Sequence, residues 1–362
     1  MRAVVLVGGE GTRLRPLTWT TPKQMLPVAE VPMIQRVLAH LADHGVDEAV
    51  LSLGYRPDAF ITAFPDGRCA GVKLTYAVEP EPLDTAGAIR FAARHAGIAE
   101  RFLAVNGDVL TDVDIGALVA FHHDRGAEAT IHLTRVDDPS RFGVVPTADD
   151  GRVSAFVEKP APGQAPTHNI NAGTYVLEPS VLDRIPAGRR VSIERETFPA
   201  LVEARTLYAR PDDAYWIDTG TPAQYLQAQL DLINGRRPGP PAPGAVERDK
   251  GVWTLGAAVI DGHVHAPALI GDASFIEVRA QVEGAIVGAG ARVHDGARVR
   301  CSVLLPGSVV RRGAVVERSV VGELAVVGER ARLLSGSVVA GRAAVAADAE
   351  LEGVKVEAGA QR

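Results

Sequence analysis

The last third of the chain carries an aliphatic residue at every sixth position, with an occasional step of five. Gly-Ala pairs, as in HDGARV and RRGAVV, put a turn between consecutive short strands. This period predicts a β-helix of hexapeptide repeats, in which three strands form one coil and stacked coils share a continuous core. An ordinary antiparallel sheet would not keep this phase over such a length. The column comprises Val264, Ile270, Ile276, Val282, Val287, Val293, Val299, Leu304, Val310, Val316, Val321, Val327, Leu333, Val339, Val345 and Leu351.

Residues 1–233 instead alternate short apolar runs with amphipathic segments. This alternation predicts a mainly parallel sheet covered by helices on both faces, the Rossmann-like doubly wound architecture. In such sheets ligands bind beyond the carboxyl ends of the strands. The expected strands are Ala3–Val7, 48–53, 72–78 and 101–108, and the expected helices follow Pro32 and cover 85–96 and 114–125.

A Pro- and Gly-rich stretch, NGRRPGPPAPGAVERDK at 234–250, separates the two patterns. Because it lacks apolar periodicity it predicts an inter-domain linker, with a long surface loop inside one domain as the alternative. The expected fold class is α/β, a doubly wound mainly parallel sheet followed by a left-handed parallel β-helix. We expect an α/β domain over 1–233, the linker over 234–250 and the β-helix domain over 251–362.

The composition excludes several classes of protein. A formal net charge of −6 gives no general attraction to nucleic acid or to an anionic membrane. The two cysteines, Cys69 and Cys301, form neither a disulfide framework nor a metal-ligand motif. No signal-peptide pattern is present, and no apolar run approaches the ~20 residues that span a bilayer. We therefore expect a cytoplasmic protein without nucleic-acid or membrane partners.

The segment GGEGTRLRPLTWTTPKQMLPV at 8–28 lies where the first strand should give way to a helix. Its glycines let backbone N–H groups approach a ligand, and oriented N–H groups beside basic side chains suit a polyphosphate. Two common phosphate motifs do not fit, because G-G-x-G differs from G-x-G-x-x-G and no Lys-Ser/Thr pair follows as in a Walker loop. The candidates for phosphate binding are Gly8, Gly9, Gly11, Arg13, Arg15 and Lys23.

The full string, G-G-x-G-T-R-L-x-P-L-T and then P-K-x-M-x-P-V, resembles the sugar-1-phosphate nucleotidylyltransferases. The resemblance covers nearly the whole chain, since a hexapeptide β-helix follows the catalytic domain in many of these enzymes. SIERETFP and PLDTAGA look most like the mannose-1-phosphate guanylyltransferases. The other motifs are VNGDVL at 105–110, FVEKP at 156–160, NINAGTYV at 169–176, VSIERETFP at 191–199 and YWIDTGTP at 215–222.

The resemblance implies a Mg²⁺-dependent transfer of GMP from GTP to mannose 1-phosphate, with GDP-mannose and pyrophosphate as products. An ionised oxygen of the sugar phosphate attacks the α-phosphorus in line, so no general base is needed. The protein must bring two polyanions together and stabilise the charge that develops. Residues 1–233 would be the nucleotidyltransferase domain, and we expect a homo-oligomer.

The resemblance also implies a role for individual residues. Asp108 in NGD and Asp218 in WIDTG correspond to the two magnesium ligands, and hard carboxylate oxygens suit an ion shared with phosphates. Arg13 corresponds to the arginine that grips the triphosphate, and Lys23 to the lysine that neutralises the approaching phosphates. The sugar side would comprise Glu158, Lys159, Asn171 and Gly173, and the nucleotide side Gly8, Gly9, Gly11, Thr12, Glu79 and Gly87.

Base recognition is implied for the segment VEPEPLDTAGA, where the Glu79 carboxylate could accept hydrogen bonds from guanine. The family pattern has glycine before TAG, whereas this chain has Asp84. An aspartate there restricts the backbone and adds negative charge near the nucleotide, or it caps the following helix. Two alternatives stay open: the same reaction with dTTP or UTP and glucose 1-phosphate, and a catalytically silent homologue that binds nucleotide sugars and regulates an enzyme.

Overall fold

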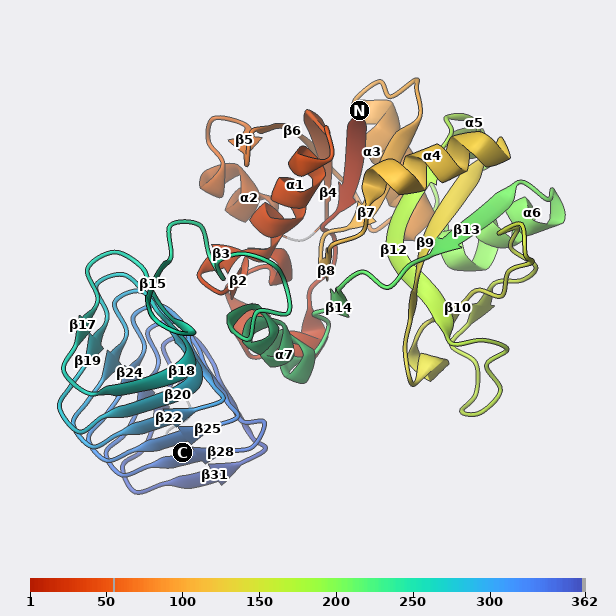
Figure 1. The fold of residues 1–362 in the computed structure, drawn as a ribbon. Coiled ribbons are helices and arrows are strands. Elements are labelled where there is room, and N and C mark those ends of the chain that lie inside the picture. Colours follow the sequence, from red (N-terminus) through yellow and green to blue (C-terminus); the bar gives the residue numbers. More distant parts are fainter. Residues whose placement is uncertain (55, 360–362) are drawn as a thin grey trace. The chain divides into compact units, whose positions relative to one another are not determined.

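The computed structural model describes residues 1–54 and 56–359. The chain runs back and forth between two compact units (Figure 1). The first, which we call the sheet unit, comprises Met1–Gly9 and Ile34–Trp216. The second, which we call the β-helix unit, comprises Glu10–Met33 and Ile217–Arg362.

The domain boundaries predicted from the sequence follow chain order and therefore differ from this division. Residues 10–33 and 217–233 were expected in the α/β domain, but they pack in one compact unit with the coils of the β-helix. Of the predicted β-helix domain, residues 360–362 lie outside the described part of the chain.

The sheet unit is built on a mixed sheet with a parallel centre. Strand β1 (Arg2–Leu6) lies between β4 (Glu48–Leu53) and β7 (Phe102–Asn106) and is parallel to both. Strand β6 (Val72–Val78) is parallel to β4, and β12 (Asn169–Leu177) is antiparallel to β7. The α/β class with a mainly parallel sheet is thus confirmed. The remaining strands of this sheet are β5 (Arg68–Cys69), β9 (Ala129–Arg135), β10 (Gly143–Val144), β11 (Val157–Glu158) and β13 (Leu207–Pro211).

Three helices form where the sequence predicts them. Helix α1 (Met33–Asp43) follows Pro32, α3 (Asp84–His95) packs against β1, β4 and β6, and α4 (Ile115–Arg125) packs against β9, β12 and β13. Within the described residues, no helix has the length and apolar character needed to cross a lipid bilayer. The other helices described in this unit are α2 (Pro57–Ala63), the 3₁₀ turn Pro139–Arg141, α5 (Ser180–Asp183), the π-helical turn Ile193–Thr197 and α6 (Phe198–Glu203).

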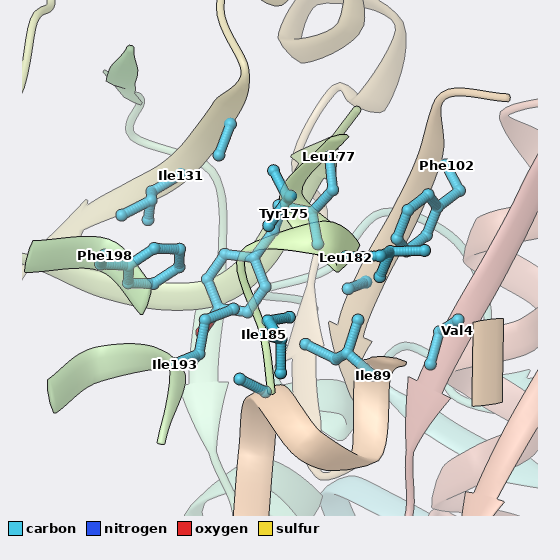
Figure 2. Close-up of a cluster of buried hydrophobic side chains, with 14 of the residues drawn as sticks. Val4, Ile89, Phe102, Ile131, Tyr175, Leu177, Leu182, Ile185, Ile193 and Phe198 are labelled. Carbon is cyan, nitrogen blue, oxygen red and sulfur yellow. The ribbon is translucent and has the colours of Figure 1, made fainter. Parts of the chain in front are cut away.

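A hydrophobic cluster anchors strand β12 in the sheet unit (Figure 2). Tyr175 of β12 is 1% exposed, and its ring meets that of Phe198 edge-on, with the centroids 5.3 Å apart. Ile89 from α3 and Phe102 from β7 belong to the same cluster. Burial of such large side chains stabilises a fold by about 1.5–3 kcal/mol each. Packing in this cluster therefore holds strand β12 in place, together with the residues at its N-terminal end.

From β18 onward the β-helix unit repeats one coil every 17 or 18 residues, whereas the first coil has 16, since Val252 pairs with Ala268 and Val259 with Phe275. Phe275 pairs with Arg292, seventeen positions on, whereas Val320 pairs with Val338, eighteen positions on. The two lengths follow from the five- and six-residue steps in the sequence. The coils form three rows of parallel strands, and the fold class of a left-handed parallel β-helix is confirmed.

The predicted aliphatic column fills the interior of these coils. Its members from Ile270 to Val345 are at most 2% exposed, and Val264 and Leu351 pack half-buried at its ends. The strands of the coils are β16 (Val252–Thr254), β17 (Val259–Ile260), β18 (His263–Ile270), β19 (Phe275–Ile276), β20 (Gln281–Val287), β21 (Arg292–Val293), β22 (Arg298–Arg300), β23 (Val303–Leu304), β24 (Val309–Val310), β25 (Val315–Glu317), β26 (Val320–Val321), β27 (Val326–Val327), β28 (Arg332–Leu334), β29 (Val338–Val339), β30 (Ala344–Val345), β31 (Glu350–Glu352) and β32 (Lys355–Val356).

The predicted linker ends in regular structure. Its residues Val246–Asp249 form strand β15, which pairs antiparallel with β16, and β16 in turn is parallel to β18. The last part of the 234–250 segment therefore begins the β-helix sheet, because its backbone finds a pairing edge there. The rest of the segment consists of turns and bends.

A two-residue hairpin follows the opening loop in the β-helix unit. Strands β2 (Pro27–Val28) and β3 (Val31–Pro32) are joined by Ala29 and Glu30, whose φ angles are 45° and 66°. Two consecutive residues with positive φ are typical of a type I′ turn, which favours Asn and Gly. Each non-glycine residue in this region costs roughly 1–2 kcal/mol, so the hairpin needs support from outside.

That support comes from helix α7 (Pro222–Ile233) and from the coils. Gln229, 1% exposed, accepts a hydrogen bond from Ala29 N through Oε1 and donates one from Nε2 to Pro27 O, both at 2.7 Å. Ala289 N donates to Glu30 Oε2 at 2.7 Å. Burial raises the pKa of the Glu30 carboxyl, and the hydrogen bond from Ala289 only partly offsets this rise.

Replacing Gln229 tests this support. Gln229→Met keeps the length of the side chain but removes both polar contacts, and we expect the free energy of unfolding to fall by about 1–3 kcal/mol. Gln281→Met, at an exposed position of β20 in the same unit, should change it by less than about 0.5 kcal/mol. Urea unfolding followed by circular dichroism measures both values. Equal values for the two variants would contradict the role assigned to Gln229.

Candidate active site

Two of the three predicted phosphate-loop glycines have backbone angles that favour glycine. Gly9 and Gly11 have φ angles of 114° and 61°. A Cβ on Gly11 would lie 3.1 Å from Thr18 Cγ2 and 3.2 Å from Lys23 Cβ, tighter than ordinary contacts. At Gly8 the nearest atoms would be 3.8 Å away, so a side chain fits there. Thr12, exposed, begins a single 3₁₀ turn that continues to Leu14.

Three of the four predicted catalytic residues come together in the β-helix unit. Lys23 Nζ lies 3.7 Å from Asp218 Oδ1, and the two side chains are 6% and 19% exposed. A Cβ on Gly220 would lie 2.8 Å from Arg13 Nη2 and 3.0 Å from Asp218 Oδ2, so this glycine makes room for both. A buried ammonium group is costly without a charge partner, which Asp218 supplies.

The fourth predicted catalytic residue, Asp108, lies in the sheet unit just beyond β7, at the carboxyl end of that strand. That Asp108 and Asp218 share one ion stays a prediction. Among residues 1–54 and 56–359, no three His, Cys, Asp or Glu side chains group as a metal cage. Mg²⁺ needs no such cage, because it binds through one or two carboxylates together with substrate phosphates.

Asn171 and Gly173 lie in a β-bulge of β12. The register with β9 shifts between Asn171 and Tyr175, and Gly173 has a φ of 78°. Asn171 Oδ1 accepts from Gly173 N at 3.0 Å, and its Nδ2 donates to Tyr175 OH at 2.9 Å. A Cβ on Gly173 would lie only 2.5 Å from Asn106 Nδ2. Bulges re-aim the chain next to active sites, and the buried Tyr175 holds this one in place.

Glu158 and Lys159 form an ion pair at the end of β11. Lys159 Nζ lies 2.7 Å from Glu158 Oε1, and the lysine side chain is 59% exposed, so the pair itself adds little stability. Lys159 has a φ of 49°, a strained angle for a non-glycine residue of the kind found at functional sites. Its backbone N–H donates to Phe142 O at 3.0 Å. A Cβ on Gly143 would lie 3.1 Å from Glu158 Oε2.

Glu79 and Gly87 shape the predicted base-binding loop from within. Glu79 Oε1 accepts from Ser52 Oγ at 2.9 Å, and its Oε2 accepts from Leu83 N at 3.0 Å. A Cβ on Gly87 would lie 3.0 Å from Leu83 Cβ and 3.1 Å from Arg189 O. Both residues thus have a packing role, and base reading by either one stays a prediction.

Asp84 adopts a conformation that glycine would take freely. Its φ is 62°, and it is the first residue of α3. Its Oδ1 accepts from Thr85 N at 2.8 Å, a local bond at the helix start. Asp is among the few residues that tolerate this region, so the departure from glycine is accommodated in the loop.

Paired substitutions at two aspartates test this conformation. At position 84, Asp84→Gly should be more stable than Asp84→Ala by about 1 kcal/mol, because alanine is strained at positive φ. Asp58, exposed in the first turn of α2, is the control. There the order should reverse, with Asp58→Ala about 1 kcal/mol more stable than Asp58→Gly. Urea unfolding gives all four values, and the same order at both positions would refute the assignment.

Two features of the structure were not predicted from the sequence. The first is the contact of Trp216 with the backbone of the β12 bulge. The sequence feature that could have indicated a role for Trp216 is its position in the YWIDTGTP motif, two residues before Asp218. A cavity of about 600 Å³ lies between α7 and the coils within the β-helix unit. Nothing in the sequence marks this cavity, because residues far apart in the chain line it, among them Leu226, Leu230, Val320 and Val338. None of the predicted site residues lines it.

Two family models match the chain. The "Nucleotidyl transferase" model matches residues 2–235, and the "GMPPB C-terminal domain" model matches residues 261–358. Together they cover the sheet, the opening loop, helix α7 and nearly all of the coils.

Named relatives agree with the first match. Mannose-1-phosphate guanylyltransferase of Mycobacterium tuberculosis is 41% identical over 298 residues, which cover 80% of this chain and 80% of that protein. Probable mannose-1-phosphate guanylyltransferase 2 of Arabidopsis thaliana is 42% identical over 254 residues, covering 67% and 69%. The crystal structure of HddC from Yersinia pseudotuberculosis is 31% identical, with a TM-score of 0.56, and covers 64% of this chain and 99% of its own. A second HddC structure contains GMP-PN and has a TM-score of 0.55. This chain therefore belongs to the nucleotidyl transferase family and is a nucleotidyltransferase.

Proposed function

We propose that this nucleotidyltransferase transfers GMP from GTP to mannose 1-phosphate and forms GDP-mannose and pyrophosphate. The observation that carries the proposal is the Lys23–Asp218 ion pair with Arg13 beside it at Gly220. Basic groups next to a hard carboxylate suit in-line transfer between two phosphates. The relatives named mannose-1-phosphate guanylyltransferase support guanine and mannose as the specific pair.

In the proposed reaction the basic residues act on the nucleotide. Arg13 grips the triphosphate and stabilises the leaving pyrophosphate, and Lys23 neutralises the phosphates as they approach. Because Lys23 is already paired with Asp218, its charge is held in place before any substrate binds. Such preorganisation lowers the cost of stabilising charge in the transition state. The proposed nucleotide contacts are completed by Gly8, Gly9, Gly11, Thr12, Glu79 and Gly87.

The sugar 1-phosphate binds to the sheet unit in this proposal. Lys159 holds its phosphate and Glu158 accepts from its hydroxyl groups. The exposed Lys159 ammonium can exchange its weak partner for a phosphate at little cost. Asn171 and Gly173 form the floor of this side through the β12 bulge. The attacking oxygen is already ionised, so no residue has to remove a proton.

Asp108 and Asp218 fit Mg²⁺ by the chemistry of their carboxylate oxygens. Bound there, Mg²⁺ would offset the charge of the phosphates that meet at the α-phosphorus. Asp218 also keeps Lys23 in position, so it has two tasks in the proposal.

The proposal extends to a cytoplasmic homo-oligomer. Val259, Ile260 and Phe275, on neighbouring strands of one outer row of the β-helix, are 39%, 37% and 40% exposed. Exposed apolar patches of this kind are typical of protein–protein contacts.

Pyrophosphate release tests the proposed reaction. GTP, ATP, UTP, CTP and dTTP are each paired with mannose 1-phosphate and with glucose 1-phosphate, with Mg²⁺ or with EDTA. We expect turnover with GTP and mannose 1-phosphate in Mg²⁺ and none in EDTA. Preference for dTTP or UTP with glucose 1-phosphate would keep the mechanism and refute the guanine assignment. Absence of turnover with every pair would favour the silent, regulatory homologue.

Two substitutions test the proposed metal ligands. Asp108→Asn and Asp218→Asn should each lower turnover about 100-fold or more, because an amide oxygen carries no charge for the metal. Asp218→Asn should also lower the melting temperature, since it removes a carboxylate charge that lies 3.7 Å from the buried Lys23 ammonium. Asp114→Asn is the control, because asparagine caps a helix as well as the aspartate that caps α4. Full turnover in both of the first two variants would refute the assignment.

A further inference from the structure

Trp216 connects two segments of the sheet unit that carry predicted sugar-side residues. Its indole Nε1 donates to Ala172 O at 2.9 Å. Its ring meets that of Phe142 edge-on, with the centroids 5.7 Å apart and the planes at 76°. The side chain is half-buried, so part of the ring stays accessible.

The contact with Ala172 fixes the bulge of β12. Ala172 is fully buried and lies between Asn171 and Gly173, where the register with β9 is interrupted. A buried carbonyl without a hydrogen-bond donor is costly. The bulge interrupts the ladder with β9 at Ala172, so the carbonyl of Ala172 needs a donor from elsewhere. The indole N–H gives it a partner and thereby holds the backbone on which Asn171 and Gly173 depend.

The contact with Phe142 links Trp216 to the Glu158–Lys159 pair through the backbone of β10 and β11. The backbone carbonyl of Phe142 accepts from Lys159 N at 3.0 Å, and the next residue, Gly143, pairs with Glu158 across the β10–β11 ladder. Lys159 has a strained φ of 49°, which persists only where the surroundings hold it. Packing of Trp216 against Phe142 is part of those surroundings.

We propose that Trp216 is a positioning residue for the sugar 1-phosphate, an inference that rests on the proposed function for the identity of its ligand. It sets the spacing between the β12 bulge and the turn at Lys159, so that one phosphate and its sugar meet both at once. Loss of Trp216 therefore weakens binding of the sugar phosphate and leaves binding of the nucleotide unchanged. A residue that only stabilised the fold would change both equally.

Two substitutions separate the contacts of Trp216. Trp216→Phe keeps an aromatic ring beside Phe142 but removes the N–H donor to Ala172. Trp216→Leu removes the ring contact as well. Trp253→Phe is the matched control, because Trp253 is half-buried in β16 of the β-helix unit, whereas the predicted sugar-side residues belong to the sheet unit.

The measurements are KM and kcat for mannose 1-phosphate and GTP, together with the melting temperature. In Trp216→Phe we expect KM for mannose 1-phosphate to rise about 3- to 10-fold and KM for GTP to stay within about 2-fold. Trp216→Leu should raise the first value further, and Trp253→Phe should change neither. Equal changes in both KM values, or no change in Trp216→Phe, would overturn the inference.

Calorimetric titration of the wild type with mannose 1-phosphate and with GTP separates this inference from the proposed function. Wild type that binds mannose 1-phosphate but turns over no pair refutes the proposed function alone. The affinity of Trp216→Phe for mannose 1-phosphate then decides the inference, with the same 3- to 10-fold loss expected. Wild type that binds neither compound overturns both.

Discussion

The hydrogen bonds of Gln229 support the part of the molecule on which the phosphate side depends. They hold a hairpin whose two turn residues, Ala29 and Glu30, both have unfavourable positive φ. Two strained residues together cost about 2–4 kcal/mol, which a helix and the coils must offset. Gln229 lies 200 residues from Ala29 in sequence, so this support exists only in the folded β-helix unit. Lys23 stands just before the hairpin in the chain, and its ion pair with Asp218 lies in the same unit.

The predicted site residues are distributed over two units that are stabilised in different ways. In the β-helix unit, α7 contacts β18 and β20 and follows Asp218 closely in the chain. Val320 and Val338 line the cavity at α7 and are each only 1% exposed. The residues that follow them, Val321 and Val339, belong to the coil interior. The buried interior of the coils is therefore the hydrophobic core of the unit that holds the phosphate-side residues. In the sheet unit, the hydrophobic cluster around Tyr175 is the corresponding core for the sugar-side residues.

Much of the fold could be predicted from the sequence because its signals are local and repeated. Strands β4 and β6 have the predicted bounds, and the aliphatic column is buried because every coil offers its residue the same environment. The roles of Gln229 and Gly220 depend on partners far along the chain, so no local pattern marks them. Asp84 is an intermediate case: the sequence left a restricted backbone and a helix cap as alternatives. The φ of 62° gives Asp84 the restricted backbone, whereas Leu83 occupies the N-cap position and Asp84 Oδ1 accepts only from the adjacent Thr85 N. For the site, the sequence motifs pointed to Arg13, Lys23 and Asp218. The β12 bulge and its contact with Trp216 could be recognised only from the three-dimensional structure.

The repeating coil of the β-helix limits where such a chain can gain or lose residues in the course of evolution. Deleting one residue at a turn converts a coil of 18 residues into one of 17, and both already occur here. Deleting a whole coil leaves every later strand with the same side facing inward. A deletion that breaks the five- or six-residue step would instead turn the aliphatic residues of later coils toward water. Length changes in this last third of the chain should therefore preserve that step.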